Sequence, residues 1–239
     1  KQAALPARDT AVPAAMAPAL CHGAFRGTPV RIAALLLVAV VLIAIFAPWL
    51  ATHDPQLIKP GERLLVVSAE HLMGTDVLGR DVFSRVMVGA RVSLTVGIGV
   101  AVASVVLGLM IGVVAGYFRM ADAIIMRVMD GLMAIPGILL AIALVALLGG
   151  GLLTVMVAIV VPETPRVVRL VRGMILSVRN EPYVEAAVAL GTPSLTLLVR
   201  HLVPNTFAPL TVQGSFILAS AMLTEAAMSF LGVGLPPEI

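Results

Sequence analysis

Five long apolar runs constrain this chain more than any other feature of its sequence. They cover residues 31–50, 91–118, 123–148, 152–178 and 206–232. A transmembrane helix needs about 20 mostly apolar residues to cross the hydrocarbon core of a bilayer, and each run meets that length. The sequence therefore predicts an all-α, polytopic membrane protein with five spans.

The charged residues are few, and their distribution favours a lipid environment. Only 12% of the residues are charged, whereas soluble domains average about 25%. The mean hydropathy is +1.07. The net charge is +3, but the basic residues lie near span ends and form no run with interleaved aromatics, so anionic lipid is the expected partner and nucleic acid is not. The single cysteine, Cys21, excludes an internal disulfide and a multi-cysteine metal site.

The basic residues also predict how the chain is oriented. Residues 1–30 are rich in Ala and Pro, contain several basic side chains and show no helical or strand period, which indicates an irregular arm. The positive-inside rule places this arm in the cytoplasm, so the first helix (31–50) leaves it and residues 51–90 form an extracytoplasmic loop. A secretory signal peptide is the alternative for 31–50, but the run exceeds a usual signal core and further spans follow. Residues 91–239 form the main transmembrane domain.

Small and charged residues inside the spans predict how the helices pack. Gly108, Gly112 and Gly116 recur every four residues, a stripe that lets a second helix approach closely. Pro136 is expected to kink the third span. Asp130 is expected to pair with the nearby Arg127. Three arginines are expected to anchor the fourth span at the lipid headgroups, namely Arg166, Arg169 and Arg172.

A second polar interruption of the apolar runs extends from residue 182 to 205. Pro182 suits the first turn of a short helix, and Gly191 suits its end. Thr192 and Pro193 then read as the N-cap and first residue of a second short helix that Pro204 ends. The segment therefore predicts a helix, a turn and a helix. It is either a docking element or an ordinary cytoplasmic connector between two spans.

The spacing within this segment resembles the EAA loop of type I ABC importer permeases, the element that sits in a groove of the cytoplasmic ATPase in that family. His201 and Val203 stand where the family usually has Ile and Leu, and the Arg-His-x-x-Pro-Asn string at 200–205 is similar to the dipeptide, oligopeptide and nickel group. The resemblance implies coupling helices at 182–204. The residues implied to couple to the ATPase are Glu185, Ala186, Ala187, Gly191, His201, Pro204 and Asn205.

Two further strings resemble the same group. The first is HLMGTDVLGRDVFSR at 71–85, in which turns and local ion pairs are expected to build a compact surface segment. A plain surface loop is the alternative, and a metal site would need more than His71 and the two aspartates. The second is LTEAAMSFLGVGLPP at 223–237. The structural motif in the first string consists of Gly74, Thr75, Asp76, Gly79, Arg80 and Asp81.

Glu225 is the carboxylate placed furthest inside an apolar run. A charge at a helix centre costs roughly 2.5 to 3.5 kcal/mol on insertion scales, so this side chain should face protein or water. Two roles stay open, namely lining the translocation path of a solute and hydrogen bonding to a neighbouring subunit.

The resemblance implies a type I ABC importer transmembrane domain in a bacterial plasma (inner) membrane. The implied partners are a second homologous permease subunit, two ABC ATPase subunits and an extracytoplasmic solute-binding protein. ATP and Mg would bind to the ATPases, because this chain has no G-x-x-x-x-G-K-[ST] loop, and no catalytic residue, metal or cofactor is expected in it. In the family a sixth span follows the point where this sequence stops. The resemblance does not identify the solute, and peptides, glutathione and nickel chelates are all compatible with it.

Two other classes of function would need residues that this sequence does not offer. An intramembrane enzyme is disfavoured because the chain has no H-E-x-x-H or nucleophile-elbow motif and its four histidines lie outside the apolar runs. An ion-gradient-driven secondary transporter or channel would need coupling charges inside several spans, and only Glu225 qualifies.

Overall fold

The computed structural model describes residues 28–234, and its regular structure there is helical apart from one isolated bridge between Thr75 and Asp81. Most of the expected N-terminal arm, Cys21 and residues 235–239 lie outside the described residues. The four long helices are α2 (Thr28–Leu50), α3 (Val82–Tyr117), α6 (Leu152–Val178) and α9 (Phe207–Phe230). The shorter ones are η2 (Pro60–Glu62), α4 (Arg119–Met133), α5 (Gly137–Leu148), α7 (Pro182–Ala189), α8 (Ser194–Leu197), η3 (Leu198–Leu202) and η4 (Val203–Thr206).

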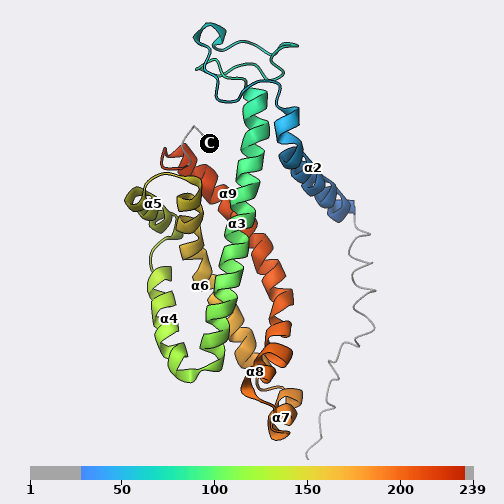
Figure 1. Cartoon of the computed structure of the whole chain (residues 1–239), viewed down its shortest axis with the longest axis vertical. Helices are drawn as coiled ribbons and strands as arrows, with labels where there is room; N and C mark the ends of the chain where they lie inside the picture. Colours follow the sequence, from blue (N-terminus) through green and yellow to red (C-terminus); the bar gives the residue numbers. More distant parts are fainter. Residues whose placement is uncertain (1–27, 235–239) are drawn as a thin grey trace, which may run out of the picture.

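Helix α3 is the axis of the molecule, and α2, α6 and α9 pack against it. Residues 51–81 form a cap at the N-terminal end of α3, whereas α7 and α8 lie at the opposite end (Figure 1). Within the described residues, three helical stretches are long and apolar enough to cross a membrane: Thr28–Leu50, Val82–Tyr117 and Ser194–Phe230. The pair α4–α5 makes a fourth if it is taken as one bent span. The fold is therefore an all-helical, polytopic membrane protein.

The glycine stripe on α3 is the contact surface for α6, as its spacing predicted. A Cβ atom built on Gly108 would lie 2.4 Å from the Cβ of Val167, and one on Gly112 would lie 2.7 Å from the Cβ of Val171. Gly116 meets Ile175 in the same way one turn further on. The two backbones are closer than any side chain on these three positions permits, so the glycines are required for the packing.

Helix α3 begins at Val82, well before the expected residue 91. The earlier start is explained by an N-cap that composition does not reveal. The Asp81 carboxylate accepts a hydrogen bond from the backbone N–H of Ser84 at 2.8 Å. Such a cap satisfies one of the unpaired donors of the first helical turn. The expected extracytoplasmic loop is therefore shorter than 51–90, and its last turns belong to the helix.

The third expected span is not one kinked helix. It consists of α4 and α5, which meet at an angle of 89°. Pro136 has an extended ψ of 125° and serves as the N-cap residue of α5, so the helical path ends before it and starts again after it. A proline inside a helix removes one hydrogen bond and clashes with the previous turn, which explains where the break lies.

Ion pairs to α6 fix the position of α4. Asp130 pairs with Arg169 at 2.7 Å, so the expected pairing with Arg127 is wrong. Asp122 binds Arg172 through both oxygens, one of them at 2.7 Å from Nη2. Arg166 pairs with Glu163 of its own helix at 3.1 Å. Two of the arginines that were expected to act as lipid anchors thus join α6 to α4.

Candidate functional site

Helix α7 begins and ends where the sequence predicted. Pro182 occupies its first turn. At the other end Gly191 has a φ of +77°, a left-handed conformation that glycine adopts without strain. The backbone N–H of Thr192 donates to the carbonyl of Ala187 at 3.1 Å, and the N–H of Gly191 donates to the carbonyl of Val188 at 2.9 Å. These two bonds form a Schellman motif, which turns the chain sharply toward the next helix.

The second short helix differs from the prediction at both ends. Pro193, and not Thr192, is its N-cap residue, and no side-chain cap is present. Pro204 does not end the helical path, which continues through a π turn (η3) and a 3₁₀ turn (η4) into α9. The wide turn followed by a tight one accommodates a residue without an N–H. The amide of Asn205 supports this junction by donating to the carbonyl of His201 at 2.6 Å.

We call residues 182–204 the knob. Its inner side is fixed to the body of the protein by Val184 and Leu197, which are both buried. Among the residues singled out from the sequence, Ala187 is also buried and His201 is half-buried. Those that are exposed are Glu185, Ala186, Gly191, Pro204 and Asn205. The predicted residues therefore divide into an inner set that holds the knob and an outer set that is accessible.

Sequence reasoning missed two parts of the knob. Leu190 and Leu195, one on each side of the turn at Gly191, are 87% and 73% exposed, and we call these two leucines the tip of the knob. Val188 and Val199 are exposed as well. The hydroxyl of Tyr183 accepts a hydrogen bond from the side-chain amide of Asn205 at 3.2 Å, which ties α7 to the start of α9. The apolar pattern of the sequence does not distinguish these exposed leucines from buried ones, because their exposure depends on the turn at Gly191.

A hollow of about 460 Å³ lies between α7, α8 and the ends of α3 and α6. Glu185, Arg179 and Tyr117 lie on its wall beside apolar residues such as Val184 and Leu197. The hollow separates part of α7 from the bundle. Glu185 therefore faces space that a second protein can enter, and not the interior of the fold.

The cap at the other end of α3 is built by turns and ion pairs. Gly74 and Gly79 have positive φ values, and a Cβ on Gly79 would lie 1.9 Å from the carbonyl oxygen of Lys59. The Asp76 carboxylate accepts from the backbone N–H groups of Leu78 and Arg80 at 2.8 and 2.9 Å. It also pairs with the guanidinium groups of Arg80 and Arg85.

Asp76 makes the stability of the cap depend on pH. Partial burial acts to raise its pKa, but the backbone hydrogen bonds from Arg80 and Leu78 and the Arg80 side chain outweigh burial and lower the pKa from 3.8 to about 2. A carboxylate whose pKa is lowered by folding stabilises the folded state at pH values above its pKa in the unfolded chain. This stabilisation is lost as the pH falls from about 4 to about 2.

We expect the substitution Asp76→Asn to lower the free energy of unfolding by about 2 kcal/mol at neutral pH. Thermal unfolding between pH 2 and 7 tests this prediction. The difference in unfolding temperature between wild type and Asp76→Asn should vanish at the acidic end of this range. Glu70→Gln, at an exposed carboxylate, is the control and should unfold like wild type at neutral pH.

Glu225 lies on α9 and is only 6% exposed. Its Oε1 accepts a hydrogen bond from the hydroxyl of Ser229 at 3.0 Å, and Ser93 of α3 donates to Oε2 at 3.5 Å. The expected protein environment is therefore provided by this chain itself, and the carboxylate joins α9 to α3.

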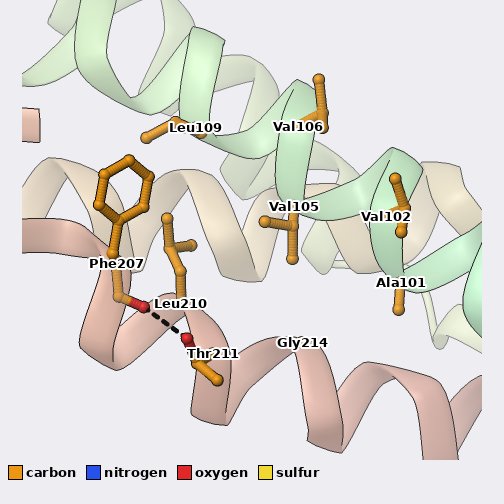
Figure 2. Close-up of a pocket in the computed structure, with 9 residues that line it drawn as sticks. All are labelled: Ala101, Val102, Val105, Val106, Leu109, Phe207, Leu210, Thr211 and Gly214. Atoms are coloured by element: carbon orange, nitrogen blue, oxygen red, sulfur yellow. Dashed lines mark hydrogen bonds between the residues drawn. The ribbon is translucent and has the colours of Figure 1, made fainter. Parts of the chain in front are cut away.

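A groove of about 400 Å³ between α3 and α9 has a different character (Figure 2). Its walls are hydrocarbon, from residues such as Val105, Leu109 and Leu210. The hydroxyl of Thr211 is already used, since it donates to the carbonyl of Phe207 at 2.9 Å. The groove offers no free polar group for orienting a polar solute.

Comparison with known proteins agrees with this arrangement. Residues 104–238 match the family model described as binding-protein-dependent transport system inner membrane component. The chain is 52% identical over 198 residues to a probable peptide ABC transporter permease protein of Sinorhizobium fredii, covering 83% of this chain and 68% of the relative. It is 43% identical to a probable D,D-dipeptide transport system permease of Escherichia coli (87% and 71% covered), and 39% identical to a glutathione transport system permease of Pectobacterium atrosepticum (87% and 69% covered). The chain therefore belongs to the family of binding-protein-dependent transport system inner membrane components, as a permease subunit of an ABC importer.

Proposed function

We propose that this permease subunit forms half of a translocation path for peptides or similar small polar solutes, and that it receives mechanical work through the knob. The proposal on the solute is supported by the names of its relatives, which refer to peptides, D,D-dipeptides and glutathione. The proposal on coupling is supported by the residues themselves. Family membership implies ATPase and binding-protein partners.

The observation that carries the coupling proposal is the exposed apolar tip of the knob. Leu190 and Leu195 are exposed on the two sides of a short turn, and Glu185 of the preceding helix α7 is exposed as well. Contiguous exposed apolar side chains rimmed by polar groups are typical of sites that contact another protein. The inner face is fixed to α3 and α6, so a push on the tip would reach the long helices directly.

The same proposal includes an orientation. The knob would face the cytoplasm and two ATPases, and the cap of residues 51–81 would face the extracytoplasmic solute-binding protein. The cap and the knob lie at opposite ends of α3, which is consistent with this orientation (Figure 1). Helix α6, which is not among the three apolar stretches above, would be the additional span of a five-span topology. A second homologous permease subunit would complete the path.

Reconstitution in liposomes tests the transport function. The permease pair, two ATPases and binding protein should take up a labelled dipeptide when ATP is supplied, and the permease pair alone should not. Uptake that follows an ion gradient without any ATPase would contradict the proposal and favour a secondary transporter or channel.

Glu225 is proposed to face the path in at least one conformation, with Ser93 and Ser229 as its partners when it does not. Under this proposal Glu225→Gln keeps the hydrogen bonds but removes a charge, so uptake should slow several-fold while thermal stability stays near that of wild type. Ser229→Ala serves as the matched control, because it removes the hydrogen bond and leaves the carboxylate. Wild-type uptake kinetics with lower stability in Glu225→Gln would instead assign this residue to packing.

A further inference from the structure

Two histidines and an aspartate meet in the cap above the start of α3. His53, His71 and Asp81 each present a ligand atom, and these atoms lie within 4.8 Å of one another. His71 and Asp81 are buried, and His53 is half-buried. The imidazole rings of the two histidines lie side by side with their centres 4.9 Å apart. His53 is outside the 71–85 string, so the sequence pattern did not reveal this cluster.

The start of α3 holds all three residues in place. The Nδ1 atom of His71 lies 3.0 Å from Oδ1 of Asp81, and the other Asp81 oxygen accepts from the backbone N–H of Ser84. The fully buried hydroxyl of Ser84 accepts a hydrogen bond from the backbone N–H of His53 at 3.0 Å. One helix terminus therefore fixes the backbone of His53 and the carboxylate of Asp81 relative to His71.

Glu62 completes the surroundings of His71. Its Oε2 atom lies 3.5 Å from Nε2 of His71, on the far side of the ring from Asp81. Without an ion, the shorter contact of Nδ1 with Asp81, at 3.0 Å, holds the ring proton on Nδ1. An ion on Nδ1 would displace that proton, and Glu62 is then placed to accept the proton on Nε2. Metal-binding histidines commonly have such an outer carboxylate. A cavity of about 40 Å³, lined by His53, Glu62, His71 and Asp81 among others, provides the room.

We propose that His53, His71 and Asp81 bind one divalent transition-metal ion of the zinc class. Two imidazoles and one carboxylate are ligands that Zn²⁺ takes at sites with a fourth position open to water, whereas Mg²⁺ and Ca²⁺ prefer oxygen ligands. The amine of Lys59, 3.0 Å from Glu62, keeps that carboxylate in the outer shell and out of the first one. The bound ion would join residue 53, just after α2, to the first turn of α3.

The alternative is a plain hydrogen bond between His71 and Asp81 that fixes the cap without an ion. Both possibilities explain the 3.0 Å distance between Nδ1 of His71 and Oδ1 of Asp81, but only the metal site needs His53 as a ligand. A hydrogen-bonded pair requires no third ligand, so His53→Gln would be neutral. A metal site loses one of its three protein ligands in the same variant.

Equilibrium dialysis of the metal-free chain in nanodiscs against Zn²⁺, followed by elemental analysis, tests the proposal. We expect one zinc ion per chain for wild type and for Glu70→Gln, an exposed carboxylate of the same cap. His53→Gln should lose stoichiometric zinc. Glu62→Gln should bind zinc about tenfold more weakly, as is usual for an outer-shell partner. Asp81→Asn removes the charged ligand but keeps a good N-cap for α3, so it should also lose zinc while remaining folded.

Thermal unfolding gives an independent readout that does not require transport. Zinc should raise the unfolding temperature of wild type and Glu70→Gln, and it should leave that of His53→Gln unchanged. Absence of bound zinc in folded wild type would overturn the proposal. Equal zinc binding by wild type and His53→Gln would overturn it as well, since the ion would then be held elsewhere. Neither result depends on the proposed transport function, because no solute or ATPase is present.

Discussion

Replacing Gly112 with leucine is expected to prevent α3 and α6 from packing together. A Cβ atom at this position would lie 2.7 Å from the Cβ of Val171 and 2.9 Å from the backbone oxygen of Val168. The oxygen belongs to a helix backbone and cannot rotate away, so the two helices must separate. Overpacking a core usually costs about 1 to 3 kcal/mol, and a leucine that forces two long helices apart should reach or exceed the upper end of that range.

The measurement is thermal unfolding of the purified protein in detergent, together with the yield of folded protein from the membrane. Gly89→Leu is the matched control, because Gly89 lies on the same helix and a Cβ there has no neighbour within 4 Å. The control should unfold near the wild-type temperature. If Gly112→Leu and Gly89→Leu unfold at the same temperature, the close approach at Gly112 does not contribute to stability.

This packing is the part of the fold that the sequence predicted best. Gly108, Gly112 and Gly116 form one face of a helix by spacing alone, and in a membrane a small-residue face has few uses besides close helix contact. The positions of Gly191 and of the Asp76 turn were predictable for a similar reason. Each depends on residues within one or two turns of chain, whose conformational preferences are local.

The break at Pro136 was only partly predictable from the residues around it. Proline in the apolar run predicted a bend but not its 89° size. On the N-terminal side of the break, α4 is held to α6 by the pairs of Asp122 with Arg172 and of Asp130 with Arg169. These ion pairs join residues far apart in the sequence, so nothing near Pro136 encodes the angle. The same separation hid the partners of His71, because Glu62 and His53 belong to earlier parts of the loop.

Pro204 was expected to stop a helix and does not. A proline prevents one backbone hydrogen bond, and the chain can absorb that loss by changing the pitch of two successive turns when tertiary contacts hold both sides. Here Leu202 and Thr206 are buried on either side of Pro204, which holds the path in line with α9. The outcome depends on packing that the sequence pattern does not display.

Reversing the charge of Glu185 is expected to abolish uptake in the reconstituted importer while the protein still folds and inserts. Glu185 is exposed on the knob, so arginine can occupy the position without burying a charge within this chain. At an interface with an ATPase, however, replacing one partner of a buried charged contact costs about 2 kcal/mol or more, which weakens association about thirtyfold. Glu70→Arg makes the same reversal on an exposed position of the cap, far from the knob, and should leave association with the ATPases unchanged.

Gly191→Leu tests the same interface through shape instead of charge. The left-handed φ of Gly191 costs a side-chain-bearing residue about 1 to 2 kcal/mol, and no neighbouring atom blocks the new Cβ. The Schellman turn should therefore relax and move Leu190 and Leu195 away from their place at the tip, while the buried face of α7 still holds the knob to the bundle. We expect ATP hydrolysis by the assembled importer to continue with little uptake. Normal uptake by both Glu185→Arg and Gly191→Leu would exclude the knob as the coupling element, because work from the ATPases would then have to enter the chain through another surface.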